Sequence, residues 1–179
     1  DKAKSQTEKL TELVNSLVSL SRLDEEKSPL KFSEFNISDA VNETAGSFSD
    51  FAASNGKTLE ISVEPDITYN GDEYAVRQLV SILIDNAIKY ADPSSPILVS
   101  LKKSKKKIII KTENACAEPI KGDLSKLFDR FYRADESRNS ETGGFGIGLS
   151  LAKSIAEGHG GKISASSPEE NRIVFTVTL

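Results

Sequence analysis

Apolar and polar residues alternate along this chain with two different periods. In the first 26 residues leucines recur every three to four positions, which predicts one amphipathic helix with a bundle or coiled-coil face. Charged residues at positions 24–27 and then Pro29 end this pattern. Because an isolated helix leaves such a stripe exposed, we expect a partner helix that is not part of this chain. The stripe comprises Leu10, Leu13, Val14, Leu17, Val18, Leu20 and Leu23.

From residue 29 to residue 179 helical and strand periods follow one another, which predicts an α/β domain. Asn36 or Ser38 can cap its first helix, and Gly158 ends its last. The predicted helices span residues 39–53, 73–91 and 147–157. The predicted strands span residues 30–35, 59–63, 67–69, 97–101, 107–112, 162–165 and 173–179.

Two segments between these elements stand out by composition. Residues 102–107 carry five lysines between two predicted strands. We interpret them as a solvated hairpin, with a partner site as the alternative. Residues 134–144 contain no large aliphatic side chain, and they predict a mobile loop.

Composition narrows the classes of protein. The 179 residues, 37% of them hydrophobic, suffice for one domain with a real core plus an appendage. The net charge of −4 does not favour a general nucleic-acid-binding role. A single cysteine, Cys116, rules out an internal disulfide framework. We see no apolar run of membrane-spanning length and no signal peptide, and since the chain begins within a helical pattern and lacks Met, we expect it to be part of a longer protein.

The candidate chemistry lies in two asparagines and a glycine run. Residues 143–149 read GGFGIGL and precede a helical pattern. Glycines there allow backbone N–H groups to approach a phosphate, and the start of the next helix adds positive potential. Such a run can also be only a flexible loop.

Asn86 falls on the apolar face of the helix over residues 73–91. A carboxamide there needs partners, so Asn86 either bonds to neighbouring backbone or binds Mg²⁺ and nucleotide phosphates. Lys89 and Tyr90 follow one turn later. They are either surface residues or groups that place a cation and a hydroxyl beside the same phosphates.

Further candidates follow along the chain. Asn114, at the end of a strand, is a turn residue or a partner for an adenine edge. Core packing accounts for Phe128, whereas Phe131 and Tyr132 can anchor a hinge or lid. Arg138 is solvated or closes on a triphosphate.

Other chemistries are excluded. His159, the only histidine, lies in a helix-terminating Gly-His-Gly-Gly turn, which favours a structural role. One His and one Cys do not make a zinc site. The chain has no G-x-S-x-G elbow and no P-loop, so acyl transfer and P-loop ATPase chemistry are not expected.

In this order the motifs resemble the ATP-binding catalytic domain of bacterial two-component sensor histidine kinases, over about residues 30–179. Residues 83–90 (LIDNAIKY) are similar to the family's N box, and residues 127–133 (LFDRFYR) to its F box. Residues 144–149 (GFGIGL), followed by Ala152-Lys153 and His159-Gly160-Gly161, are similar to its G2 box. Residues 1–28 resemble the second helix of the dimerisation and phosphotransfer hairpin, which leaves residues 29–179 as the catalytic domain.

The resemblance implies a two-layer α/β sandwich, shared with gyrase, Hsp90 and MutL ATPases, that binds Mg-ATP under a lid over residues 134–144. It implies that Asn86 holds Mg²⁺ and phosphate, that Asn114 contacts adenine and that Phe131 anchors the lid. His159 does not match the phosphoacceptor, which the resemblance places upstream of Asp1, so no catalytic residue is expected in this chain. The implied ATP site comprises Asn86, Lys89, Tyr90, Asn114, Ile120, Phe131, Arg138, Gly144, Gly146, Ile147, Gly148 and Leu149.

The resemblance also implies a whole protein. It would be a homodimer that transfers the γ-phosphoryl group of ATP to its own hairpin histidine and then to a response-regulator receiver domain. This catalytic domain would be cytoplasmic, in a sensor of the inner or plasma membrane. The expected partners are that receiver domain and the hairpin, and no nucleic acid.

Three departures from the family's pattern leave alternative functions open. Residues 114–118 (NACAE) lack both glycines of the family's D-x-G-x-G G1 box, Ile82 stands where a polar residue is frequent, and the phosphoacceptor helix is missing. A non-catalytic regulatory docking module is therefore the alternative to a kinase. An ATPase that uses ATP for dimer closure is a third hypothesis, disfavoured because Ile82 offers no general base for water.

Overall fold

The computed structural model describes Thr7, Thr11, Val14, Val18 and residues 30–93, 95–116, 122–132, 146–169 and 171–179. Apart from those first four residues, the predicted N-terminal helix lies outside the described residues, as do the predicted loop over residues 134–144 and the candidates Ile120, Arg138 and Gly144. No helix in the described part of the chain is long and apolar enough to cross a membrane.

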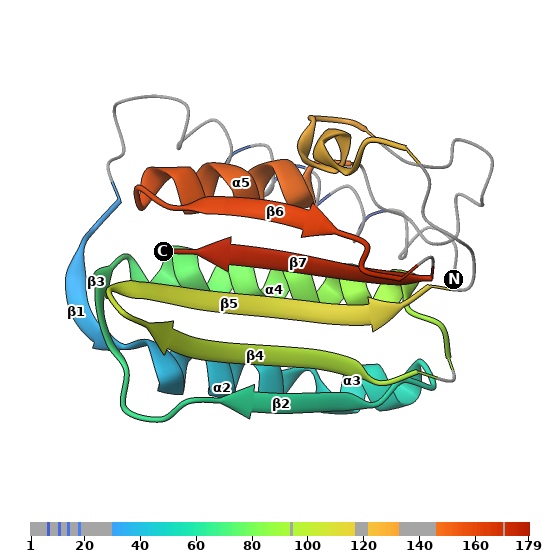
Figure 1. The fold of residues 1–179 in the computed structure, drawn as a ribbon, viewed down its shortest axis with the longest axis horizontal. Coiled ribbons are helices and arrows are strands. Elements are labelled where there is room, and N and C mark those ends of the chain that lie inside the picture. The colour runs from blue at the N-terminus through green and yellow to red at the C-terminus, as the bar shows by residue number, and fades with distance from the viewer. Residues whose placement is uncertain are drawn as a thin grey trace.

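Two layers make up the domain, a five-stranded sheet and the helices that cover one of its faces (Figure 1). The strand order is β2-β4-β5-β7-β6, in which β2 pairs parallel with β4 and every other pair is antiparallel. This architecture confirms the α/β sandwich expected from the sequence. The strands are β2 (Leu59–Val63), β4 (Ile97–Ser104), β5 (Lys107–Ala115), β6 (Lys162–Ser166) and β7 (Arg172–Thr178).

A separate two-stranded ribbon, β1 (Ser33–Asn36) with β3 (Thr68–Gly71), lies at one end of the sandwich (Figure 1). The prediction placed the first strand over residues 30–35, but residues 30–32 lie before it. Leu30 and Phe32 contact the end of the last helix instead, and the N–H of Lys31 donates to Asp72. The helices are α2 (Ile37–Ser47), α3 (Ser49–Ser54), α4 (Glu73–Tyr90) and α5 (Gly148–Gly158), with a 3₁₀ turn η1 (Leu124–Phe128).

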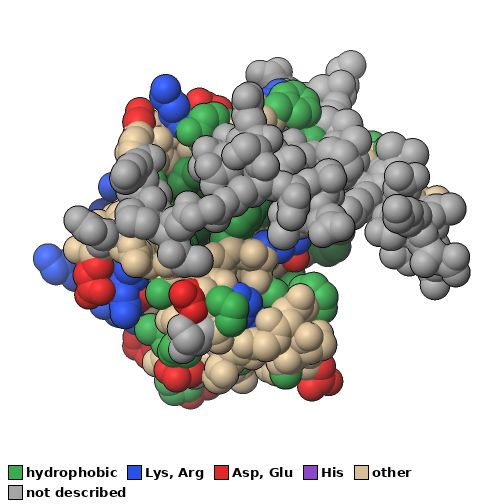
Figure 2. All heavy atoms as spheres, turned by 90° about the vertical axis from the view of Figure 1, so that its right-hand side faces the viewer, with side chains coloured by type: hydrophobic (Ala, Val, Ile, Leu, Met, Phe, Trp, Pro, Cys, Tyr) green, Lys and Arg blue, Asp and Glu red, His purple; other side chains and the backbone are tan. Residues whose placement is uncertain are grey.

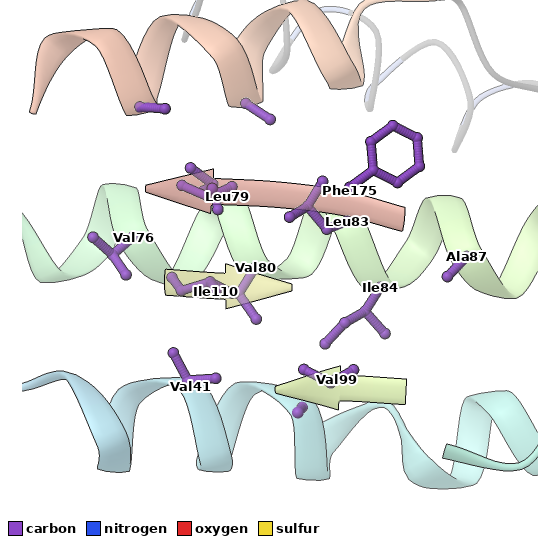
Figure 3. Close-up of a cluster of buried hydrophobic side chains, with 14 of the residues drawn as sticks. Val41, Val76, Leu79, Val80, Leu83, Ile84, Ala87, Val99, Ile110 and Phe175 are labelled. Carbon is purple, nitrogen blue, oxygen red and sulfur yellow. The ribbon is translucent and has the colours of Figure 1, made fainter. Parts of the chain in front are cut away.

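The core lies between α4 and the inner face of the sheet (Figure 3). Alternate residues of β4 and β5 point into it, because successive side chains of a strand face opposite sides. Val99 and Ile110 are both fully buried under α4. The buried face of α4 agrees with the apolar face predicted for the helix over residues 73–91. It comprises Ala75, Val76, Leu79, Val80, Leu83, Ile84, Ala87 and Ile88.

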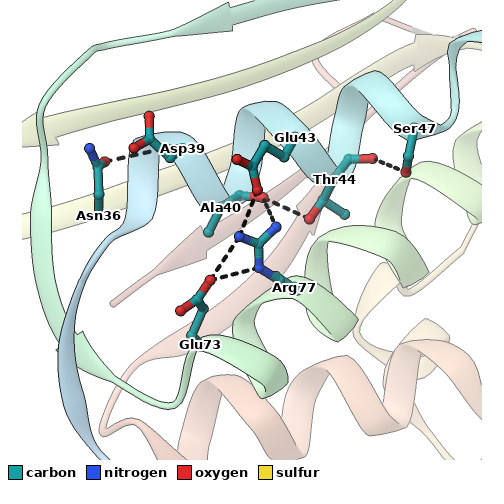
Figure 4. A network of polar contacts seen from close by, with 8 residues as sticks. All are labelled: Asn36, Asp39, Ala40, Glu43, Thr44, Ser47, Glu73 and Arg77. Carbon is teal, nitrogen blue, oxygen red and sulfur yellow. Dashed lines mark hydrogen bonds and ion pairs between the residues drawn. The ribbon is translucent and has the colours of Figure 1, made fainter.

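The structure decides between the two predicted caps of the first helix and corrects the extent of that helix. Asn36, not Ser38, is the cap, because its side chain accepts a hydrogen bond from the N–H of Asp39 at 3.1 Å (Figure 4). The single helix over residues 39–53 is two helices, α2 and α3, that meet at Phe48. Phe48 donates its N–H to the carbonyl of Ala45, so the hydrogen-bond pattern tightens there.

Arg77 ties α2 to α4 on the helical side of the sandwich. Its guanidinium contacts Glu43 at 2.9 Å and Glu73 at 2.7 Å, and it also donates to the carbonyl of Ala40 (Figure 4). This contact joins α2 to α4, the helix that carries Asn86, Lys89 and Tyr90.

Candidate functional site

The candidate residues that the structure describes gather at one end of the sandwich, where α4 and β5 end and α5 begins (Figure 1). Asp72 caps α4 at its start by accepting from the N–H of Ala75 at 3.0 Å. The helix ends at Ala91, whose N–H bonds to the carbonyl of Ala87. Ala91 also forms an isolated bridge with Cys116, which holds the end of α4 against the end of β5.

Asn86 lies half-buried near the end of α4. Within the described residues its carboxamide makes no side-chain hydrogen bond, so its oxygen is available to a ligand. The prediction put Asn86 on the buried face, and the structure places it at the edge of that face. Ile82 precedes it by four residues, so both side chains lie on one side of the helix.

Ile82 packs against the start of α5. A Cβ built on Gly148 would lie 3.4 Å from Cγ2 of Ile82. This contact accounts for an apolar residue at position 82, and it brings the first residue of α5 close to the side of α4 that carries Asn86. Ile147 caps α5 without a side-chain hydrogen bond, so no side chain in the described part of the chain satisfies the first N–H groups of this helix.

Gly146 lies against the backbone that follows η1. It has a φ of +69°, and a Cβ there would lie 2.8 Å from the carbonyl carbon of Phe131 and from the carbonyl oxygen of Tyr132. Glycine is therefore required at position 146 by a backbone contact. This is a structural reason for the residue, beside the phosphate contact that the sequence suggested.

Phe131 holds an unusual backbone conformation, with a φ of +63°. Its side chain is 65% exposed, whereas Phe128 is buried and packs edge-on against Phe175. The expectation that Phe128 belongs to the core is confirmed. The anchoring of a lid by Phe131 stays a prediction, because the lid lies outside the described residues.

Lys89 and Tyr90 lie at the last turn of α4. The ammonium of Lys89 contacts the carboxylate of Asp85 at 2.6 Å, so it is paired within its own helix. Tyr90 is 48% exposed. Their proximity to phosphates stays a prediction, and for Lys89 it requires that Asp85 release or share the ammonium.

Asn114 is 2% exposed, on the inner face of β5. Its amide group donates to the carbonyl of Ala115 at 3.0 Å and to the sulfur of Cys116 at 3.6 Å. The side-chain oxygen has no bonded donor among the described residues, so it keeps the acceptor that the predicted contact with an adenine amino group requires. The local bonds also fit the alternative of a residue that shapes the turn.

Charged groups surround this end of β5. Burial raises the pKa of the Cys116 thiol, with a smaller contribution from the charge of Asp92, while the hydrogen bond from Asn114 acts in the opposite direction. Burial lowers the pKa of the Lys57 ammonium, which donates to the carbonyl of Ala91, and the charge of Asp92 opposes that shift. Sequence reasoning missed Lys57, because no local pattern indicates that it reaches the end of α4.

Basic and acidic side chains both lie on the described part of this end of the molecule (Figure 2). No cluster of three or more His, Cys, Asp or Glu side chains in the described part of the chain could hold a metal ion by itself. A Mg-nucleotide would bring ligands of its own to this end, because its phosphates supply oxygens, and Asn86 would add one more.

Comparison with known proteins gives three findings. A family model described as histidine kinase-, DNA gyrase B- and HSP90-like ATPase matches residues 71–179. A sensor protein, DltS of Streptococcus agalactiae serotype V, is 36% identical over 179 residues. That match covers 100% of this chain and 45% of the relative, so the chain spans less than half the relative's length.

Two solved structures share the fold. Full-length ShkA in complex with AMPPNP aligns with a TM-score of 0.81 at 20% identity, over 94% of this chain and 35% of that one. The histidine kinase ThkA in complex with the response regulator TrrA aligns with a TM-score of 0.76 at 22% identity, over 97% of this chain and 48% of that one.

Proposed function

Because the chain belongs to the histidine kinase-, DNA gyrase B- and HSP90-like ATPase family, we propose that its catalytic domain binds Mg-ATP where α5 begins beside α4. The observation that carries this proposal is the contact of Gly148 with Ile82, one helical turn before Asn86. It sets the uncapped start of α5 beside a carboxamide that has no bonded partner among the described residues. A helix start favours phosphate, and a carboxamide oxygen suits Mg²⁺.

Each described residue has a defined part in this proposal. Asn86 would hold Mg²⁺ and phosphate, and the backbone of Gly146 and Gly148 would face the phosphates, with Ile147 and Leu149 beside them. Asn114 would accept from the adenine amino group. Lys89 and Tyr90 would flank the phosphates. Ile120, Arg138 and Gly144 remain candidates by their sequence positions alone.

The proposed reaction is transfer of the γ-phosphoryl group to a histidine. The protein's work in such a transfer is placement and neutralisation of charge. Bound Mg²⁺ would supply part of that charge, while Lys89 would add a cation beside the phosphates. We do not propose His159 as the acceptor, since both of its ring nitrogens are hydrogen-bonded at the other end of α5.

We also propose the wider setting of this domain. Residues 1–28 would be the second helix of a dimerising hairpin whose first helix carries the acceptor histidine. A response-regulator receiver domain would then take the phosphoryl group, as the complex of ThkA with TrrA suggests for that kinase. The whole protein would be a homodimeric membrane sensor with this domain in the cytoplasm.

Autophosphorylation of the full-length protein tests this proposal. With radiolabelled ATP and Mg²⁺, we expect an alkali-stable, acid-labile phosphohistidine that is lost in Asn86→Ala. Residues 1–179 alone should bind nucleotide and acquire no label. Stable phosphohistidine on residues 1–179, or none on a folded full-length protein that binds ATP, would contradict the proposed transfer.

A further inference from the structure

Residues 30–32 lie against the end of α5, at the opposite end of the sandwich from the candidate site (Figure 1). A Cβ on Gly158, the last residue of α5, would lie 2.9 Å from Cδ1 of Leu30. The ring of Phe32 stacks on that of His159, with 5.1 Å between centroids and an interplanar angle of 14°. The segment that enters the catalytic domain therefore rests on the C-terminal end of α5.

Asp72 joins this segment to α4. One carboxylate oxygen accepts from the N–H of Ala75 at 3.0 Å and so caps α4. The other accepts from the N–H of Lys31 at 2.9 Å. One side chain thus serves both the first turn of the helix that carries Asn86 and the backbone of the entering segment.

His159 completes the connection between the two helices. Its Nε2 accepts from the backbone N–H of Asp72 at 3.0 Å, so its Nδ1 carries the proton and donates to the carbonyl of Ile155 at 2.8 Å. The ring of Tyr69 lies beside it, with 6.0 Å between centroids. His159 therefore contacts the end of α5, the residue before α4 and the entering segment at once.

The two helices run in opposite directions (Figure 1). Their other ends, the last turns of α4 and the first turn of α5, are the walls of the candidate site. A change in how the entering segment lies would act first on the cap of α4 and the end of α5. A helix that shifts as one piece carries such a change along its length.

We infer that His159 is a positioning residue that couples residues 30–32 to both helices of the candidate site. Release of Phe32 or Lys31 would weaken the cap of α4, and bound nucleotide would in turn strengthen the contacts of the entering segment, since such coupling is reciprocal. Only this last step rests on the proposed function. Phe32 is 49% exposed, so its stack is a surface contact that can open without loss of the core.

Amide hydrogen exchange, resolved by NMR, tests the coupling without nucleotide. His159→Phe keeps a ring for Phe32 to stack on and removes both ring hydrogen bonds. His159 makes no hydrogen bond to Lys31, so the coupling must pass through Asp72. We expect the Lys31 amide to exchange about tenfold faster, the equivalent of one lost hydrogen bond, relative to the Ile110 amide in the sheet. Phe32→Leu removes the stack and should likewise speed exchange at the Ala75 amide.

Phe51→Leu provides the matched control, because Phe51 is an exposed aromatic residue in α3. This substitution should change the exchange rate of neither the Lys31 amide nor the Ala75 amide. Faster exchange at Lys31 in His159→Phe supports the coupling. If His159→Phe lowers the free energy of unfolding and leaves the Lys31 and Ala75 amides unchanged relative to Ile110, His159 only fills space and the inference is wrong.

A second arm adds a non-hydrolysable ATP analogue with Mg²⁺. Saturation with the analogue should slow hydrogen exchange at the Lys31 amide at least about threefold in the wild type and leave that rate unchanged in His159→Phe. Equal slowing in both proteins would contradict the coupling. If the wild type binds no analogue, the proposed function fails, while the exchange rates without nucleotide still decide the role of His159.

Discussion

The N–H of Phe131 donates to the carbonyl of Gly146 at 2.9 Å, and both residues have positive φ values, +63° and +69°. Positive φ is costly for a phenylalanine, so the contact with Gly146 helps to hold the backbone after η1 in this shape. Phe131 and Gly146 belong to two motifs that sequence analysis treated as separate, residues 127–133 and residues 144–149. The contact makes their described parts one structural unit. Its stability depends on the absence of a side chain at position 146.

Gly146→Ala should destabilise the domain. The new Cβ meets backbone atoms of Phe131 and Tyr132 at 2.8 Å and forces alanine into the left-handed region. We expect a loss of about 1–3 kcal/mol in the free energy of unfolding, measured by urea denaturation. The matched control is Gly46→Ala in α2, where a Cβ meets nothing within 4 Å and the helix should gain about 0.5–1 kcal/mol. Equal effects of the two substitutions would contradict this account.

Ser38→Ala should destabilise the domain through a buried polar group. The hydroxyl of Ser38 donates to the carbonyl of Glu64 at 2.6 Å and accepts from the N–H of Ile67 at 3.0 Å. Alanine leaves both backbone groups without this partner, at a cost of about 1–3 kcal/mol. Ser54→Ala, in which an exposed hydroxyl is lost, is the control. Thermal unfolding that shifts equally in both variants would show that burial of Ser38 is unimportant.

Cys116 predicts an alkaline dependence of stability. Burial raises the pKa of its thiol above the ordinary value of 9.0 in the folded state. The folded state then binds more protons than the unfolded state above pH 9, so the contribution of Cys116 to stability is present below that pH and lost as pH rises through the folded-state pKa. The difference in free energy of unfolding between wild type and Cys116→Ala should therefore shrink between pH 8.5 and 10.5. A constant difference would contradict the raised pKa.

The raised pKa of the Cys116 thiol also predicts that this thiol is alkylated slowly. The thiolate is the reactive form, and Cys116 is half-buried beside Asn114. At pH 8 iodoacetamide should modify it at least about tenfold more slowly than free cysteine, because less of it is ionised and access is reduced. Addition of urea above the unfolding midpoint should remove the protection. Modification of the folded protein at the rate of free cysteine would show that burial does not govern this thiol.

Sequence periodicity predicted the elements whose signal is local. The long apolar stripe of α4 predicted residues 73–91 against an observed helix of Glu73–Tyr90. The break between α2 and α3 was missed because Phe48, where the two helices meet, is neither glycine nor proline. The 3₁₀ turn η1 was missed for a related reason, since so short an element has no period of its own.

The candidate site was predicted less completely than the fold. Motif spacing indicated Asn86, Gly146 and Gly148, and the structure brings the ends of their elements together. Motif spacing did not indicate that Asp85 pairs with Lys89 or that Lys57 reaches Ala91, because those contacts depend on rotamers and on distant elements. The structural role expected for His159 is confirmed by its two ring hydrogen bonds, but its link to Asp72, 87 positions earlier, left no local signal.

Calorimetric titration of Mg-ATP into residues 1–179 tests the central claim most directly. We predict saturable binding that is lost in Asn86→Ala and retained in Asn42→Ala, an exposed asparagine of α2. Both variants should keep the wild-type unfolding midpoint, since Asn86 makes no side-chain hydrogen bond within the described residues. Absence of binding by the wild type at millimolar nucleotide, or equal binding by Asn86→Ala, would contradict the assignment of an ATP site to this end of α4.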